Sequence, residues 1–314
     1  MKYGFPEGWF LNIKDIGTLS KRLNVNLKYL KDLENKIPKN YRVVSLTKKG
    51  KNRLLSVPSD QLKNFQKAIL KNILIFDFPV YVQGGISGRS IVKNANFHKQ
   101  KNWVACLDIH KFFPSVHYSK VRDVFINLGC SNDIATVLTH FTTYNYELPQ
   151  GAPTSPVIAN LILYNFDVRV SNLCKTKRLQ YSRYFDDVTI SGNKKLDSTC
   201  SKVVKIAKDE GFNIPTDNPK KFNKMYKSSP QIVTGLIVNG KKLKPNDDFI
   251  SDLIKNIEIL SQGHYPSLDI YKLMERTKGM ISFLESIDFK KASVLKEKMR
   301  SINWNKFGLN PKFY

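Results

Sequence analysis

Two adjacent acidic residues, Asp186 and Asp187, stand between two short runs of β-forming residues near the middle of the chain. The runs cover residues 179–184 and 188–191. Two strands that meet at such a pair form a hairpin with both carboxylates at its tip. Like charges held side by side cost free energy unless a cation neutralises them, and Mg²⁺ prefers oxygen ligands. The run therefore predicts a metal-binding hairpin, and a solvated Asp-Asp turn is the alternative.

A third carboxylate, Asp108, follows the apolar, strand-like residues 103–107. An aspartate at the end of a buried strand is costly without a partner. The alternative is a carboxylate that faces water or pairs with Lys111. If neighbouring strands of one sheet bring Asp108 to Asp186, the acids could hold two metal ions. Such an arrangement stabilises the attacking and leaving oxygens in phosphoryl and nucleotidyl transfer.

The residues 148–156 read Leu-Pro-Gln-Gly-Ala-Pro-Thr-Ser-Pro, and an apolar stretch over 157–170 follows them. The prolines predict a rigid turn, and Gly151 allows a backbone or a ligand to approach closely. The apolar stretch predicts a helix. A loop that leads into a helix N-terminus suits the base or phosphate of a nucleotide, although an ordinary loop explains the pattern too.

The charge balance indicates a polyanionic partner. The 314 residues hold 51 Lys and Arg against 26 Asp and Glu, a net charge of +25, and 11% of them are aromatic. This combination is typical of proteins that bind nucleic acid. A basic ribosomal-type or membrane-surface protein is the alternative, but neither needs three acids in this pattern.

The four cysteines show no metal-ligand spacing and indicate reduced thiols of a cytosolic protein rather than a zinc site or a disulfide framework. They are Cys106, Cys130, Cys174 and Cys200. The first residues lack the apolar core of a signal peptide. No apolar run approaches the ~18 residues that a membrane helix needs. A cytoplasmic protein without a membrane partner is expected.

Apolar spacing and turn residues predict a mixed, α+β chain. Helices are expected over residues 12–36 with a turn at 20–26, and over 61–75, 119–128, 133–142, 195–211, 249–260, 268–284 and 292–299. A hairpin is expected over 41–57, turning at 48–51, and a strand over 232–238. The basic segment 290–314 includes Trp304, which favours RNA contact, while a solubilising charged helix is the alternative.

Taken together, the three acidic and loop motifs resemble a reverse transcriptase palm from about residue 40 to residue 240. Asp108 with the Phe-Phe-Pro-Ser run at 112–115 resembles the first catalytic motif, and residues 148–156 resemble the LPQG-type loop. The run Tyr-Phe-Asp-Asp at 184–187 resembles the YxDD hairpin. The resemblance implies an RNA-directed DNA polymerase in which Asp108, Asp186 and Asp187 bind two Mg²⁺ ions.

The same resemblance implies a nucleotide pocket. Phe113 falls where the family places the aromatic residue that rejects a ribose 2′-hydroxyl. The other implied nucleotide contacts are Arg53 and Lys51 at the triphosphate, Gln150 with Gly151 at the incoming nucleotide, and Lys220 or Lys221 near the pyrophosphate. Tyr184 and Phe185 belong to the hairpin at the primer end. Phe185 stands where relatives usually carry a smaller residue, so its ring is expected to press on the primer end or the nucleotide.

Two short motifs narrow the resemblance to retron reverse transcriptases, although each alone could be an ordinary turn. They are Asn94, Ala95 and His98 of an NAxxH signature, and Val233, Thr234 and Gly235 of a VTG signature. With Trp304, these residues are the candidates for RNA recognition. The implied fold is a right-hand polymerase. Residues 1–100 would form the N-terminal helices and fingers, 101–240 a palm with an antiparallel sheet backed by helices, and 241–314 a helical basic thumb.

The retron resemblance also implies partners. They are deoxynucleotides, a dedicated structured RNA that supplies a 2′-hydroxyl primer, the RNA–DNA hybrid product and an effector protein in antiphage defence. The alternatives are another defence-associated or group-II-intron-like reverse transcriptase, and a non-catalytic RNA-binding scaffold with a polymerase fold.

Overall fold

The structure is a computed structural model that describes residues 3–34, 36–48, 51–262 and 269–307. The chain divides into two compact units. The first comprises Met1–Ser90 and Trp103–Lys224, and the second Ile91–Asn102 and Met225–Tyr314. Mixed helices and antiparallel sheets confirm the predicted α+β class. The division into fingers, palm and thumb at the predicted boundaries stays a prediction.

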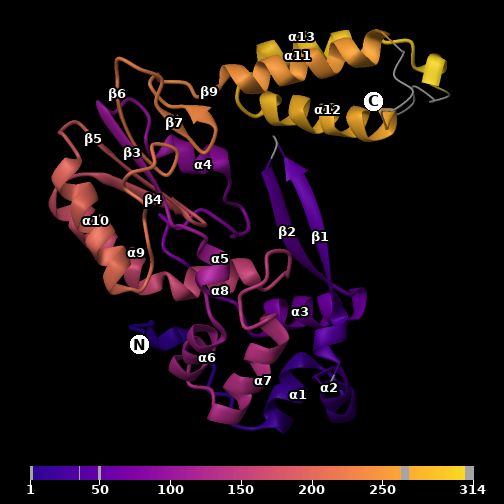
Figure 1. Cartoon of the computed structure of the whole chain (residues 1–314), viewed down its shortest axis with the longest axis vertical. Helices are drawn as coiled ribbons and strands as arrows, with labels where there is room; N and C mark the ends of the chain where they lie inside the picture. The colour runs from indigo at the N-terminus through magenta and orange to yellow at the C-terminus, as the bar shows by residue number, and fades with distance from the viewer. Residues whose placement is uncertain (1–2, 35, 49–50, 263–268, 308–314) are drawn as a thin grey trace. The chain divides into compact units, whose positions relative to one another are not determined.

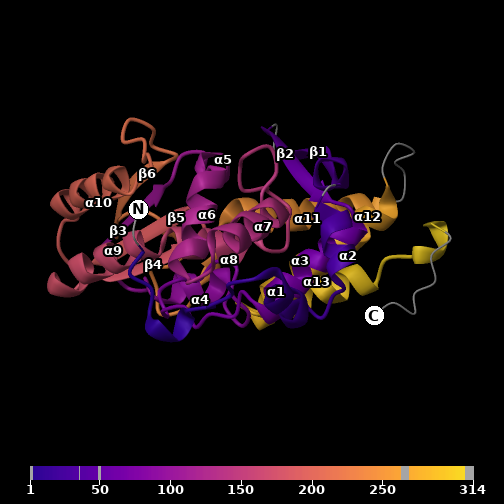
Figure 2. The same cartoon turned by 90° about the horizontal axis from the view of Figure 1, so that it is seen from below.

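A four-stranded sheet organises the first unit (Figure 1). Its strands are β3 (Trp103–Asp108), β4 (Gln180–Tyr184), β5 (Asp187–Gly192) and β6 (Phe222–Tyr226), in the order β4-β5-β3-β6. Strands β4 and β5 pair antiparallel with Tyr184 opposite Asp187, which confirms the predicted hairpin. Both views show α9 (Tyr164–Thr176) and α10 (Asp197–Asp209) alongside this sheet (Figure 2).

Helices make up most of the rest of this unit. They are η1 (Glu7–Trp9), α1 (Ile16–Leu23), α2 (Leu27–Glu34), η2 (Ile37–Asn40), α3 (Asp60–Asn72), α5 (Phe112–Ser115), α6 (Tyr118–Asn127), α7 (Asn132–Thr142) and α8 (Ser155–Ile162). Side-chain caps fix several starts: Asp15, Ser59 and Ser131 accept hydrogen bonds from the first turns of α1, α3 and α7. The predicted helix pair within 12–36 is confirmed as α1 and α2.

Two features of the first unit refine the predictions. Strands β1 (Tyr41–Lys48) and β2 (Lys51–Pro58) pair antiparallel over their whole length, which confirms the predicted hairpin. The prediction of one helix over 157–170 is wrong, because α8 ends at Ile162 and α9 starts at Tyr164, with Leu163 between them. Leu163 has φ −86° and ψ 4°, a backbone conformation that interrupts the regular helix.

The second unit holds α4 (Ile91–Asn96), a small sheet of β7 (Ile232–Val233), β8 (Leu236–Ile237) and β9 (Lys244–Pro245), and the helices α11 (Asp247–Gln262), α12 (Ile270–Glu285), α13 (Phe289–Arg300) and η3 (Trp304–Phe307). The three long helices share an apolar core that includes Leu253, Ile281 and Leu295. The prediction of one strand over 232–238 is wrong. Thr234 and Gly235 have φ 45° and 86°, so the chain turns there into a tight hairpin. No helix of the described residues is long and apolar enough to cross a membrane.

Candidate active site

The register of the central sheet sets the positions of the predicted acids. Asp108 ends β3, Asp187 begins β5, and the two residues are directly paired across the antiparallel strands. The backbone nitrogen of Ile109 donates to the carbonyl oxygen of Asp186 at 3.0 Å, which holds the hairpin turn against the end of β3. Asp186 is half-buried, Asp187 is exposed, and the Asp108 side chain is 20% exposed. The backbone of Asp108 therefore lies beside those of Asp186 and Asp187 at one end of the sheet, and their joint role as a site stays a prediction.

Lys221, the residue directly before β6, pairs with the first of these acids. The Nζ of Lys221 lies 2.5 Å from Oδ1 of Asp108, and the backbone nitrogen of Asp108 donates to the carbonyl oxygen of Lys221 at 2.8 Å. Lys220 is exposed, and its backbone nitrogen donates to Asn218. Of the two lysines that the sequence left open, Lys221 is the one whose side chain contacts a predicted metal ligand.

The donor chemistry of this edge suits Mg²⁺. Three carboxylates at the end of two paired strands offer only hard oxygen ligands, and an ammonium group already offsets the charge of Asp108 in this structure. Among the described residues, however, no three His, Cys, Asp or Glu side chains are gathered closely enough to hold a metal ion. The residues therefore fit the ion in type and strand register, and metal binding stays a proposal.

The hairpin turn carries Phe185 in the left-handed region, at φ 55°. Two glycines make room for it: a Cβ on Gly84 would lie 2.4 Å from the backbone nitrogen of Phe185, and one on Gly85 would lie 2.9 Å from Cε1 of its ring. Both distances are too short for a real contact. The segment that contains Gly84 and Gly85 thus packs against the turn of the β4–β5 hairpin.

A buried ion pair lies beneath this turn. Arg183 is fully buried, and its Nε and Nη2 donate to the two carboxylate oxygens of Asp167 at 2.7 and 2.6 Å. The Tyr181 hydroxyl donates to the same carboxylate at 2.5 Å. Burial and the nearby Asp167 charge raise the pKa of Tyr181 well above its usual value, so the phenol stays protonated and remains a donor. The guanidinium is thereby fixed in a single orientation.

The remaining face of that guanidinium holds the turn. The Nη1 of Arg183 donates to the carbonyl oxygen of Phe185 at 2.8 Å and to Oδ1 of Asn160 at 3.1 Å. Asn160, itself buried, donates from Nδ2 to the carbonyl oxygen of Gly84 at 2.9 Å. These bonds tie the residue before Asp186 to α8 and to the glycine segment. Sequence reasoning missed the network, although a lone arginine between aromatic residues of a predicted strand signals a buried partner.

The predicted sugar-discriminating residue lies beside the turn. Phe113 is half-buried on the short helix α5, and its ring centroid lies 6.4 Å from that of Phe185 and 5.4 Å from that of Phe112. The two residues to which the sequence assigned separate effects on substrate choice are therefore neighbours. A change in either ring alters the packing of the other.

The predicted nucleotide loop contacts the first hairpin. The backbone nitrogen of Ser56 in β2 donates to the carbonyl oxygen of Gln150 at 2.9 Å. Gly151 has φ 127°, and a Cβ there would lie 2.9 Å from the carbonyl oxygen of Ser56, so this close approach requires glycine. Strand β2 also carries Lys51 and Arg53, whose side chains lie outside the part of the chain that the structure describes.

The two short motifs assigned to RNA recognition meet in the second unit. Nδ2 of Asn94 donates to Oγ1 of Thr234 at 3.4 Å, and Oγ1 of Thr234 donates to the carbonyl oxygen of Ile91 at 3.1 Å. Asn94, Ala95, His98 and Val233 are buried, while Gly235 is exposed. Burial lowers the pKa of His98 to about 3, so it is neutral at neutral pH. Their role in RNA recognition stays a prediction. Their burial indicates that they hold the turn at residues 234–235 in place.

Trp304, the remaining recognition candidate, is 4% exposed and packs with the helical core of the second unit. Its ring centroid lies 6.0 Å from that of Phe307. The indole face is therefore covered in this structure, and RNA contact by Trp304 stays a prediction.

Comparisons with known proteins agree with this geometry. The family model described as reverse transcriptase (RNA-dependent DNA polymerase) matches residues 37–242. The retron Ec86 reverse transcriptase of Escherichia coli is 32% identical over 95% of this chain and 92% of its own length. The retron Se72 reverse transcriptase of Salmonella heidelberg is 33% identical over 86% of this chain and 74% of the relative. The retron Mx162 reverse transcriptase of Myxococcus xanthus is 29% identical over 76% of this chain and 56% of the relative.

Proposed function

The chain belongs to the family of retron reverse transcriptases and is an RNA-directed DNA polymerase, and from this premise we propose that it copies a dedicated structured RNA into single-stranded DNA, primed from an RNA 2′-hydroxyl. The observation that carries the proposed active site is the pairing of Asp108 with Asp187, next to the turn at Asp186. In this register, three acidic residues from two distant segments stand at one end of a sheet. A scaffold that only bound RNA would have no need of such an arrangement.

The proposed chemistry assigns a role to each part of this edge. Asp108 and Asp186, with Asp187 in support, would hold two Mg²⁺ ions. When bound, these ions lower the pKa of the attacking hydroxyl and offset the charge of the leaving pyrophosphate. Lys221, whose ammonium contacts Asp108, stands close enough to this site to exchange its partner for a phosphate oxygen. Arg183 holds the carbonyl oxygen of Phe185 and so fixes the turn that presents the acids.

The nucleotide pocket is proposed from the same elements. Phe113 would exclude the ribose 2′-hydroxyl, supported by the ring of Phe185 beside it. Gln150 and Gly151 would line the incoming nucleotide, because their loop is held against β2. Lys51, Arg53 and Lys220 are proposed for the triphosphate on the family resemblance alone.

The proposed activity is tested by Mg²⁺-dependent incorporation of labelled deoxynucleotide on an annealed RNA template and DNA primer. Asp186→Asn removes one charge with little change of shape. It should reduce extension by at least about a thousandfold, because loss of a metal ligand removes several kcal/mol of transition-state stabilisation. Asp133→Asn is the matched control, since Asp133 is exposed in the first turn of α7, and it should extend normally. Near-normal extension by Asp186→Asn would refute the assignment.

The retron-specific part needs a second experiment. RNA that co-purifies with the protein is sequenced, resynthesised and offered as template without any added primer. DNA joined to that RNA is expected, and a 2′-deoxy substitution at the priming nucleotide should abolish it. Synthesis that needs an added primer in every case would contradict 2′-hydroxyl priming. An effector protein and a role in antiphage defence are proposed from the family alone.

A further inference from the structure

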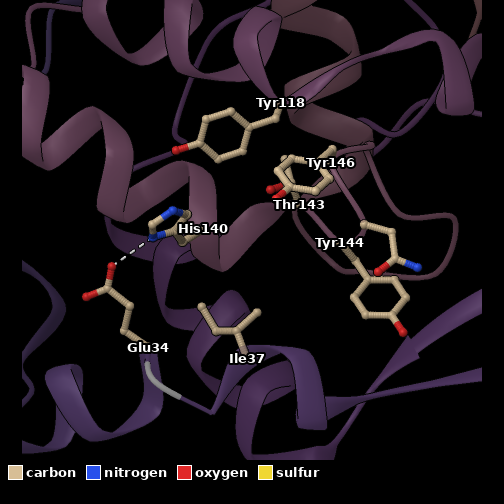
Figure 3. Close-up of a pocket in the computed structure, with 8 residues that line it drawn as sticks. Glu34, Ile37, Tyr118, His140, Thr143, Tyr144 and Tyr146 are labelled. Carbon is tan, nitrogen blue, oxygen red and sulfur yellow. Dashed lines mark hydrogen bonds and ion pairs between the residues drawn. The ribbon is translucent and has the colours of Figure 1, made fainter.

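The first unit contains a cavity of about 540 Å³ that the polymerase reaction leaves without a role (Figure 3). Aromatic, polar and aliphatic side chains line it, among them Glu34, Ile37, Tyr118, His140, Tyr144 and Tyr146. Figure 3 shows Tyr118 and His140 on one side of the space and Tyr144 on the other, with Ile37 below. A cavity of this size lies within the range of ligand pockets in proteins. Three tyrosines and a histidine around it form a surface suited to a flat, unsaturated ring.

A strained turn presents one of these tyrosines. Tyr144 and Glu147 exchange two backbone hydrogen bonds of 3.0 Å, and Asn145 and Tyr146 between them have φ 48° and 62°. Asparagine accepts the left-handed region readily, but a bulky residue such as tyrosine rarely does. Tyr146 is nevertheless 72% exposed, so burial does not offset this strain. The ring has two aromatic neighbours, with centroids 6.3 Å from His117 and 6.4 Å from Tyr118, and the part of it that stays exposed can stack on a group from outside the chain.

The surrounding rings are held in place. Tyr144 stacks on Tyr41 with ring centroids 4.4 Å apart, and the Tyr41 hydroxyl accepts a hydrogen bond from the buried Gln66 at 2.8 Å. The backbone nitrogen of Tyr118 donates to the carbonyl oxygen of Tyr146 at 2.8 Å, which ties the turn to the start of α6. The walls of the cavity are thus ordered before any ligand arrives, which lowers the entropic cost of binding.

The polar groups indicate which part of a nucleotide enters. Nδ1 of His140 pairs with Oε1 of Glu34 at 2.9 Å, and both side chains line the cavity. A carboxylate inside the cavity repels a phosphate but accepts hydrogen bonds from the edge of a base. Exposed Lys36 and Lys39 flank Ile37 in the sequence and offer positive charge outside. This distribution suits a neutral base inside the cavity and its phosphates near the lysines.

Three residues that line the cavity, Tyr144, Asn145 and Tyr146, come just before the predicted nucleotide loop at 148–156 in the sequence. Tyr144–Glu147 leads directly into Leu148, whose backbone nitrogen donates to Val116 at 3.0 Å, and then into Gln150, which contacts β2. An occupant of the cavity would therefore touch the turn from which this loop starts. An RNA strand bound along the proposed active site could therefore reach this turn with one of its bases.

We propose that this cavity binds one unpaired base of the RNA strand, stacked on Tyr146 and within hydrogen-bonding reach of Glu34 and His140. The choice of RNA rests on the proposed function. Single-stranded RNA is commonly held by stacking splayed bases on aromatic side chains, with basic residues at the backbone. The site would hold a template base outside the duplex while the enzyme copies the strand.

Binding is measured by fluorescence anisotropy with a labelled single-stranded RNA and with a blunt RNA–DNA duplex, in the absence of nucleotides. Tyr146→Ala should weaken binding of the single strand about tenfold and leave the duplex unchanged, because one stacked base is lost. Tyr146→Trp keeps a stacking face and should bind as the original protein does. Tyr271→Ala, which removes another exposed tyrosine, is the matched control. Equal affinities of Tyr146→Ala and the original protein for the single strand would overturn the proposal.

Photocrosslinking locates the contact directly. RNA that carries 4-thiouridine should crosslink to the peptide containing residues 140–147, and Tyr146→Ala should lose that crosslink. A free mononucleotide that competes as strongly as the RNA would overturn the assignment to a strand. Neither measurement requires DNA synthesis, so the proposed polymerase mechanism and the proposed base-binding cavity can be refuted independently. An inactive protein with Tyr146-dependent RNA binding would refute the polymerase mechanism alone, whereas an active one without it would refute this site alone.

Discussion

Replacing Asp167 with asparagine should destabilise the first unit strongly, because it leaves the guanidinium of Arg183 buried without a counter-charge. Arg183 and Asp167 are 0% and 1% exposed. The carboxylate accepts two charged hydrogen bonds from the guanidinium and one from Tyr181. Asparagine keeps the volume of the side chain, so no cavity forms, and the change isolates the loss of charge.

The expected magnitude follows from that burial. Breaking a buried ion pair by removing one partner costs about 3–5 kcal/mol. The whole free energy of unfolding of a domain is typically about 5–15 kcal/mol. The variant should therefore remain folded at low temperature, but its urea unfolding midpoint should be much lower. Arg169 supplies the matched control on the same helix. It pairs with Asp209 and Glu210 but is 41% exposed, so Arg169→Ala should cost less than about 1 kcal/mol.

Urea unfolding followed by circular dichroism measures both variants. A loss below about 1 kcal/mol for Asp167→Asn, equal to that of Arg169→Ala, would refute the argument from burial. A double variant separates stability from positioning: Asp167→Leu with Arg183→Met removes both charges and should regain much of the lost free energy. It should still show a reduced kcat, because the Phe185 carbonyl has lost its donor at 2.8 Å. Full kcat in this variant would contradict the positioning role.

Three further outcomes are expected. Phe113→Ala should admit ribonucleotides, because the space of the ring becomes available to a 2′-hydroxyl; unchanged discrimination between ribo- and deoxynucleotides would place the gate elsewhere. Phe185→Ala should change the distribution of product lengths while synthesis continues, and identical distributions would assign the ring to packing alone. His98, with its pKa lowered from 6.5 to about 3 by burial, makes folding pH-dependent. Between these values the unfolded state binds one proton more, so stability falls as pH falls below 6.5. Urea unfolding at roughly pH 7 and pH 5 should therefore show that His98→Gln loses about 2 kcal/mol less of its free energy of unfolding on acidification than the original protein does. Equal losses would contradict this role of His98.

Local patterns account for what the sequence predicted correctly. Alternating β-formers around Asp186 and Asp187 specified a hairpin, and the structure has β4 and β5 there. Apolar spacing specified α3, α7 and the helices after residue 245 within a few residues. Such features depend on neighbours along the chain, which a sequence displays directly.

Contacts between distant segments account for what was missed. Asp167 lies on α9, and nothing in the apolar pattern of that helix distinguishes it from an exposed acid. Only the packing of α9 against β4 brings it to Arg183. The turn at Thr234 is another case, because its left-handed backbone accompanies a side-chain bond to Asn94, 140 residues away. Neither contact has a periodic signal in the sequence.

Phe185 shows how a departure from the family pattern is accommodated. The ring packs against Gly85, where an added Cβ would lie 2.9 Å from its Cε1, while at Gly84 an added Cβ would meet the backbone nitrogen of Phe185 at 2.4 Å. The ring thereby gains a fixed place between the glycine segment and Phe113, at 6.4 Å between centroids. Its influence on nucleotide choice would consequently pass through Phe113, because that ring would shift first if Phe185 were truncated. A substitution at 185 and one at 113 should therefore be non-additive in ribonucleotide discrimination, as expected for side chains in contact.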